Sequence, residues 1–304
     1  MLIKTLACAM MASVVAVAEP PEAPPRARVE ILAETTALIA GKANELALAF
    51  RIEKGWHLYY NGQNDTGFPP TIERLTMPEG FVAREVKWPV PVRHLSAGDI
   101  LDHIYEERVT LLLPVEVPET AAGSEAEITV SLGWLVCNEA CVPGEQTVVL
   151  RLPVVRGEAV ASASKAEFER ARALLPVPLM SSDVRATATW IDGRVILTAG
   201  RPEQLREKSG EARHVEFYPA AESLPIRDLI ATGTSESGKL ELSIAQERHS
   251  GSEKPMSVRG MFAIWGEGKD AAKSPPIVFW VELPMPGGNQ APDGSSKKQP
   301  HGMK

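Results

Sequence analysis

The chain has 304 residues, a formal net charge of −7 and a hydrophobic residue content of 44%. This length and this hydrophobic content are sufficient for two domains with cores of ordinary size. An acidic chain without a basic cluster argues against nucleic acid as a partner.

The first 18 residues have the pattern of a secretory signal peptide. Lys4 gives a short positive start, an apolar stretch runs from Thr5 to Ala18, and Ala16-Val17-Ala18 supplies a cleavage site of small residues. We expect cleavage after Ala18, which leaves 286 residues and a charge of −8 because Lys4 is lost. No later apolar run approaches the roughly 20 residues that cross a bilayer. The sequence therefore predicts an exported protein that does not span the membrane and that works in an oxidising compartment.

Residues 27–155 are expected to form an antiparallel β sandwich. Hydrophobic residues alternate with other residues along several runs, which is the pattern of half-buried strands. Turn-rich stretches such as Asn61-Gly62 and Pro69-Pro70 separate the runs, as in a sandwich of many short strands. The alternating positions are Leu46, Leu48, Phe50 and Ile52; Val109, Leu111, Leu113, Val115 and Val117; Ile128, Val130, Leu132 and Trp134; and Val148, Leu150, Leu152 and Val154.

The pattern changes at residues 156–180, where Ala, Glu, Arg and Lys surround Phe168. This composition predicts a short helical linker that is stopped by Pro176 and Pro178. The linker would connect the first sandwich to whatever follows.

Strand patterns return in residues 181–285, which we expect to form a second β domain. Asp192-Gly193 lies between two β-rich runs, and this dipeptide is a strong signal for a hairpin. Residues 286–304 are rich in Gly, Pro, Ser and Lys without an apolar period, so we expect a disordered tail. The predicted fold is therefore mostly β, with two sandwich domains joined by a short helical connector.

Cys137 and Cys141 are the most informative residues, because the third cysteine, Cys8, lies in the expected signal peptide. With three residues between them, they can close a small disulfide ring or hold a metal ion. Chain-entropy arguments give a ring this small a stabilisation of only about 2 kcal/mol, which is little for a long chain. Small rings are also easily strained, which makes the bond labile. This small stabilisation and the ease of strain in so short a ring therefore favour a redox-active pair over a structural bridge.

Metal binding is the competing interpretation. A closed zinc site needs four ligands, and His57, His94 and His103 show no paired spacing that would complete the set. A Cu(I) site that uses both thiolates stays open as an alternative. The second hypothesis is therefore a non-catalytic binding or copper-handling module with a structural disulfide or a Cu(I)–thiolate site. No motif in the sequence indicates a cofactor.

In thiol:disulfide exchange, a thiolate attacks a disulfide, a mixed disulfide forms, and a second thiol resolves it. A strand that leads into Asn138-Glu139-Ala140, followed by a stop at Pro143-Gly144, is expected to place the pair on a surface turn. The negative charge of Glu139 disfavours a neighbouring thiolate. We therefore expect slow reaction with generic thiol reagents and fast reaction only with a docked partner. Labelling of the reduced protein by iodoacetamide much faster than that of free cysteine would contradict this expectation.

Three parts of the sequence resemble the amino-terminal periplasmic domain of DsbD-type thiol:disulfide interchange proteins, especially their ScsB-like branch. They are Trp134–Glu145 around the cysteines, Gly55–Asn61 with Asp65–Pro70, and Ile104–Val109. The resemblance implies an immunoglobulin-like sandwich in the periplasm that acts as a thiol:disulfide oxidoreductase of the protein-disulfide reductase type. It also implies two partners: a membrane electron donor of the DsbD, ScsB or CcdA type, and thioredoxin-fold periplasmic proteins.

The resemblance further implies roles for individual residues. By motif position, Cys141 would form the mixed disulfide and Cys137 would resolve it. The stretch from His94 to His103 would form a cap that shields the pair, with Leu95 or Ile100 in place of the phenylalanine that the family carries there. The expected supporting and cap residues are Trp56, Tyr59, Leu95, Ile100, Tyr105, Trp134 and Glu139.

The sequence departs from the best-known members of this family in two ways. Three residues separate the cysteines, as in the ScsB-like branch, where the best-known members have five. The sequence also contains neither the membrane domain nor the C-terminal thioredoxin domain with its Cys-x-x-Cys motif. A separate membrane protein is therefore expected to supply the electrons.

Overall fold

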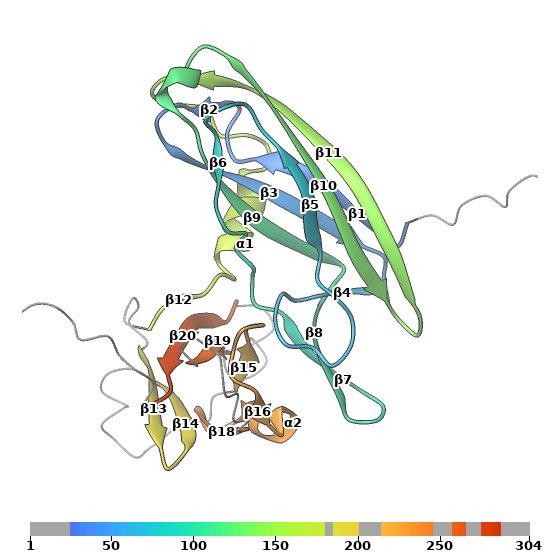
Figure 1. The fold of residues 1–304 in the computed structure, drawn as a ribbon, viewed down its shortest axis with the longest axis vertical. Coiled ribbons are helices and arrows are strands. Elements are labelled where there is room, and N and C mark those ends of the chain that lie inside the picture. Colours follow the sequence, from blue (N-terminus) through green and yellow to red (C-terminus); the bar gives the residue numbers. More distant parts are fainter. Residues whose placement is uncertain (1–24, 180–184, 201–213, 246–256, 266–274, 287–304) are drawn as a thin grey trace, which may run out of the picture.

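A computed structural model of the chain describes residues 25–179, 185–200, 214–245, 257–265 and 275–286. The expected signal peptide, and the expected tail apart from its first residue, lie outside these ranges. The described residues are mostly β, and their strand pairs are antiparallel except β2 with β11 and β12 with β20, which confirms the predicted mostly β fold class (Figure 1).

The first sandwich packs a four-stranded sheet against a seven-stranded sheet. Its strands are β1 (Ala27–Ala33), β2 (Leu38–Ile39), β3 (Ala43–Ile52), β4 (His57–Tyr59), β5 (Thr71–Thr76), β6 (Val82–Ala83), β7 (Val92–Ser96), β8 (Ile100–Glu106), β9 (Arg108–Glu116), β10 (Glu125–Cys137) and β11 (Cys141–Val155), with a 3₁₀ turn, η1 (Glu119–Ala121), before β10. The first sheet has the order β1-β3-β9-β6. The second has the order β2-β11-β10-β4-β8-β7, and β5 also pairs with β10.

Alternate residues of the long strands fill the space between these two sheets. In β10, every second residue from Ala126 to Trp134 is buried. The Trp134 ring meets Phe50 of β3 edge to face, with 5.3 Å between the ring centroids. Because side chains alternate along a strand, Cys137 at the end of β10 faces away from this core.

Helix α1 (Lys165–Arg172), within the expected linker, packs on the first sandwich. Phe168 is fully buried against Ala47 and Leu112 of that sandwich. The Thr110 hydroxyl donates a hydrogen bond to the buried carboxylate of Glu167 at 2.5 Å. The chain leaves the first sandwich only after this helix.

The second sandwich packs a five-stranded sheet against a four-stranded one, with orders β12-β20-β19-β15-β17 and β13-β14-β18-β16. Its elements are β12 (Val177–Pro178), β13 (Arg185–Ile191), β14 (Arg194–Gly200), β15 (Val215–Pro219), β16 (Ile226–Arg227), α2 (Leu229–Thr232), β17 (Thr234–Ser235), β18 (Lys239–Ile244), β19 (Ser257–Ile264) and β20 (Ile277–Pro284). The predicted hairpin at Asp192-Gly193 is confirmed, since these residues join β13 to β14 and have φ angles of 46° and 74°. Such positive angles are what a tight hairpin turn requires.

The two sandwiches share buried apolar side chains. Tyr218, Met261, Ala263 and Val278 of the second sandwich belong to the same buried cluster as the core of the first. The β7–β8 end of the first sandwich lies next to the second (Figure 1). The fold therefore brings the second sandwich close to the end of the first sandwich that carries the cysteines.

Candidate redox site

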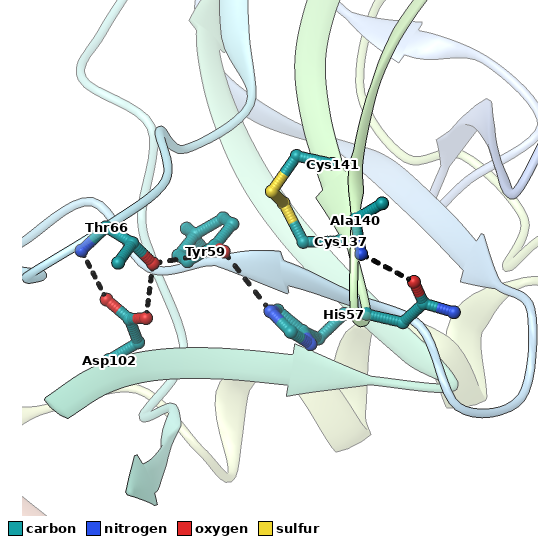
Figure 2. Close-up of a disulfide and its surroundings, with 8 residues drawn as sticks. His57, Tyr59, Thr66, Asp102, Cys137, Ala140 and Cys141 are labelled. Carbon is teal, nitrogen blue, oxygen red and sulfur yellow. Dashed lines mark hydrogen bonds between the residues drawn. A yellow bond between two sulfur atoms is a disulfide. The ribbon is translucent and has the colours of Figure 1, made fainter. Parts of the chain in front are cut away.

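Cys137 and Cys141 form a disulfide at the tip of the β10–β11 hairpin (Figure 2). They are direct cross-strand partners, with 2.07 Å between the sulfur atoms and 4.1 Å between the Cα atoms. In the turn, the Asn138 N–H donates to the Ala140 carbonyl at 3.1 Å, and the Ala140 N–H donates to Asn138 Oδ1 at 3.0 Å. The expected surface turn is therefore shorter than the sequence indicates, because β11 begins at Cys141 and continues through Pro143-Gly144.

The two cysteines differ in their exposure. Cys137 is 1% exposed and belongs to a small buried cluster with Tyr59 and Ile104. Cys141 is exposed at the start of β11. A visiting molecule can therefore reach Cys141, whereas Cys137 is enclosed.

A chain of polar side chains leads away from the disulfide (Figure 2). His57 of β4 is the register partner of Cys137. Its Nε2 lies 3.3 Å from the Tyr59 hydroxyl, which lies 3.4 Å from the Thr66 hydroxyl. Thr66 donates two hydrogen bonds to the Asp102 carboxylate, from Oγ1 at 2.5 Å and from its backbone N–H at 2.9 Å. Thr66 is exposed, whereas His57, Tyr59 and Asp102 are buried. This series of polar side chains therefore connects the surroundings of Cys137 with solvent.

Burial sets the charge of this chain. It lowers the pKa of His57, and the ring of His94, whose centroid lies 5.3 Å away, lowers it further, against the opposing influence of Asp102 and Glu106. Burial also raises the pKa of the Tyr59 hydroxyl. At neutral pH both groups are therefore mainly uncharged, and each can donate or accept a hydrogen bond.

The structure places the aromatic supporting residues on two different faces. Tyr59 lies in the cluster that contains Cys137. Trp56, Tyr105 and Trp134 instead pack against the main core, where the Tyr105 hydroxyl donates to the Pro89 carbonyl at 2.6 Å. The reason is strand alternation, because the neighbours of Tyr105 and Trp134 in sequence are the residues that face the cysteine. Trp56, Tyr105 and Trp134 therefore do not join the site.

The expected cap, residues 94–103, lies in the β7–β8 hairpin. Leu95 is 56% exposed and Ile100 is half-buried, and neither belongs to the buried cluster around Cys137. Among residues 94–103, His94 contacts the ring of His57, the register partner of Cys137. Glu139 is exposed in the turn between the cysteines.

Sequence reasoning misses His57, Thr66, Asp102 and Ile104 as members of this site and considers His57 only as a metal ligand. The available signal is period-2 alternation, which puts His57 and Tyr59 on one strand face and Asp102 and Ile104 on one face of another strand. The pairing of these strands with each other and with the Thr66 loop has no signature in the sequence. Among the residues that the structure describes, no group of three or more His, Cys, Asp or Glu side chains is arranged to hold a metal ion.

Residues 28–153 match the family model described as thiol:disulfide interchange protein DsbD, N-terminal. They form a DsbD-type N-terminal domain. The fold also resembles the crystal structure of the N-terminal periplasmic domain of ScsB from Proteus mirabilis, with a TM-score of 0.53 and 13% identity over 87% of this chain and 95% of that one. A likeness of this extent includes both sandwiches, and at this identity it shows a shared fold.

Other comparisons add little. A protein of unknown function from Porphyromonas gingivalis W83 aligns over 86% of this chain and 100% of its own, with a TM-score of only 0.26 and 9% identity. No curated protein matches the chain. Within the described ranges, no helix is long and apolar enough to cross a membrane. The resemblance that the sequence indicates is confirmed for residues 28–153, and together with the disulfide it supports a thiol:disulfide exchange module.

Proposed function

We propose that this chain is an exported thiol:disulfide oxidoreductase that relays electrons from a membrane donor to thioredoxin-fold proteins of the periplasm. The observation that carries the proposal is the disulfide of the DsbD-type domain, with Cys141 exposed and Cys137 buried. An exchange protein needs one sulfur that a partner can reach, and a second that stays enclosed until the mixed disulfide has formed. This difference in exposure supports Cys141 as the sulfur that is attacked.

The loading reaction reduces the disulfide. A thiolate of the donor attacks Sγ of Cys141, the bond between Cys137 and Cys141 breaks, and Cys137 leaves as a thiolate. Burial favours the neutral thiol, so Cys137 takes up a proton. His57 and Tyr59 are the neighbours that can deliver it, along the chain that reaches solvent at Thr66. The second donor thiolate then attacks the donor sulfur of the mixed disulfide, which releases Cys141 and a donor disulfide after transfer of two electrons.

The unloading reaction runs through the same atoms in the opposite direction. The Cys141 thiolate attacks a disulfide of the partner, and one partner sulfur leaves as a thiolate. Cys137 gives its proton to the polar side chains that begin at His57, and its thiolate attacks Sγ of Cys141. This attack displaces the second partner sulfur as a thiolate. The disulfide of the chain forms again and the partner is released as a dithiol, so two electrons have moved to the partner.

The proposal is tested by trapping. In Cys137→Ala, the mixed disulfide on Cys141 has no resolving thiol in this chain and reverses only by attack of the partner's own second thiol. Incubation with an oxidised thioredoxin-fold protein, followed by acid quenching and alkylation of free thiols, should therefore yield a covalent complex on a non-reducing gel. The matched variant, Cys141→Ala, keeps only the enclosed sulfur and should yield none. Mass spectrometry of the complex locates the linked cysteine.

Two outcomes would contradict this function. A wild-type disulfide that resists dithiothreitol would indicate a structural bridge. Tight Cu(I) binding by the reduced chain, without exchange with any thioredoxin-fold protein, would favour a copper-handling module that uses the two thiolates.

A further inference from the structure

We infer that the second sandwich positions the redox site of the first. It holds two segments beside the disulfide: the loop of residues 60–70, which carries Thr66 of the polar chain, and the β7–β8 hairpin, which carries Asp102 of that chain and His94, the ring neighbour of His57. The inference rests on the proposed function, because the role it assigns to the second sandwich is control of the reactivity of the cysteine pair.

Both segments lie at the margin of the first sandwich. The loop of residues 60–70 contains no strand or helix, and β7 is the last strand of its sheet. Loops and unpaired edge strands open more readily than the centre of a sheet. The geometry of Thr66 and Asp102 therefore depends on what supports these two segments.

The β7–β8 hairpin has two faces. His94 pairs with Asp102, and the neighbouring pair is Arg93 with His103. Side chains alternate between the faces of a strand, so the first pair faces His57 and the second pair faces the opposite side. The contact between the His94 and His57 rings fits this assignment.

The opposite face of the hairpin contacts the second sandwich. Arg93 Nη2 donates to the carbonyl of Leu229 at 3.0 Å and to that of Ile230 at 3.1 Å. The ring of His103, which is 0% exposed, meets the ring of Tyr218 edge to face, with 5.4 Å between the centroids. The hairpin is thus fixed to the second sandwich by hydrogen bonds and by packing.

The loop is held in the same way. Gly62 and Ala220 form an isolated antiparallel bridge between the two sandwiches. The backbone N–H of Gln63 donates to the Pro219 carbonyl at 3.1 Å, and its side chain donates from Nε2 to the Ser223 carbonyl at 2.9 Å. The loop is therefore joined to the second sandwich by one isolated β-bridge and by the hydrogen bonds of Gln63.

Hydrogen bonds also join the loop to the hairpin. His103 Nδ1 lies 2.8 Å from the Gln63 carbonyl, and the His103 N–H donates to Asn64 Oδ1 at 2.8 Å. The Leu101 N–H donates to Asp65 Oδ2 at 2.6 Å. The second sandwich, the loop and the hairpin form one connected unit. Thr66 and Asp102 are direct sequence neighbours of residues that make these contacts.

The test is the double variant Arg93→Met, Gln63→Leu in the full chain. It keeps the apolar stems and removes the side-chain hydrogen bonds to the second sandwich. Mutations along such a network change coupling by amounts that correspond to roughly 2- to 30-fold in an equilibrium constant. We expect a change of that size in the equilibrium constant with glutathione, and a shifted pH profile for alkylation of the reduced protein. Arg84→Met, which removes the ion pair with Glu116 in the other sheet, is the matched control.

The inference is overturned if the double variant has the equilibrium constant and the pH profile of Arg84→Met. Gln63→Leu alone serves if the double variant does not fold, and it should move both quantities in the same direction by a smaller factor. Failure here is separate from failure of the proposed function. If the chain has no exchange activity, its Cys137→Ala variant forms no mixed disulfide, and the proposed function fails. If all variants exchange equally well, only the positioning role is contradicted.

Discussion

The two sandwiches are built alike but contribute to the redox site through different atoms. Each packs antiparallel sheets around buried aromatic and aliphatic side chains. The first supplies the cysteines and the polar side chains beside them, whereas the second supplies the Tyr218 ring that packs on His103 and, above all, backbone carbonyls that accept hydrogen bonds from Gln63 and Arg93. These carbonyls belong to Pro219, Ser223, Leu229 and Ile230. Support through main-chain carbonyls depends on the position of the backbone, so it places few demands on the amino-acid identity of the residues that provide it.

The largest expected effects come from the two cores. Phe50 in the first and Phe262 in the second are both 0% exposed. Replacing either by alanine should lower the free energy of unfolding by about 3–5 kcal/mol, because a large cavity is left in a packed interior. Urea unfolding, followed by fluorescence and circular dichroism, measures this change.

The same experiment tests whether the sandwiches are energetically independent. Tyr218 and Met261 of the second sandwich belong to the cluster of the first core, so we expect Phe50→Ala and Phe262→Ala to shift one common transition. Two separate transitions, each moved by only one variant, would show that the shared cluster does not couple the domains.

The next effect concerns acid and the buried contact between the sandwiches. Burial, the largest cause, and the charge of Arg93 together lower the pKa of His103 from 6.5 to about 4, against the opposing influence of the Gln63 carbonyl, Asp102 and Glu216. As the pH falls below 6.5, the unfolded chain binds a proton that the folded chain excludes until about pH 4. Stability is therefore complete above pH 6.5 and decreases between pH 6.5 and 4, by roughly 3 kcal/mol from this residue.

Urea unfolding at a series of pH values, on the wild type and on His103→Asn, isolates this contribution. Asparagine can still donate a hydrogen bond toward the Gln63 carbonyl but does not titrate. The variant should lose less stability than the wild type between pH 6.5 and 4. Equal losses would assign the acid sensitivity to other groups, such as His57, whose pKa burial also lowers.

The smallest effect concerns the polar chain inside the first sandwich. Tyr59→Phe keeps the buried ring and removes the hydroxyl between His57 and Thr66, which should cost about 1 kcal/mol. Thr66→Val should cost more, since it leaves the buried carboxylate of Asp102 with only the backbone N–H of residue 66. Equal unfolding free energies for the two variants would mean that the hydroxyl of Tyr59 does more than link its neighbours.

Much of the first sandwich can be predicted from its sequence. Period-2 alternation identifies the long strands, and the spacing of Cys137 and Cys141 permits a disulfide while leaving a metal site as an alternative, because both signals are local. Tyr105 and Trp134 are expected at the site, although alternation puts Trp134 on the same strand face as Ile128, Val130 and Leu132. Their direction follows only when the cysteine and the core are known to lie on opposite faces of one sheet.

The contribution of the second sandwich could not be predicted from sequence. Its contacts with Gln63 and Arg93 use carbonyl groups, which every residue possesses, so no motif marks them. In the first sandwich, the role of His57 could not be predicted from sequence either. Its role depends on β4 lying next to β10, and such non-local pairing has no signature in a single sequence.

The position of the disulfide has a consequence for repeated use of the protein. Strands β10 and β11 pair at 13 positions, and the bridge joins only the last of them. When the disulfide opens, the twelve remaining pairs hold Cys137 and Cys141 in register. The two sulfur atoms therefore stay close enough to form the bond again without a rearrangement of the strands. Once the expected cleavage has removed Cys8, two thiols permit a single internal pairing, and each round of oxidation returns the same covalent isomer.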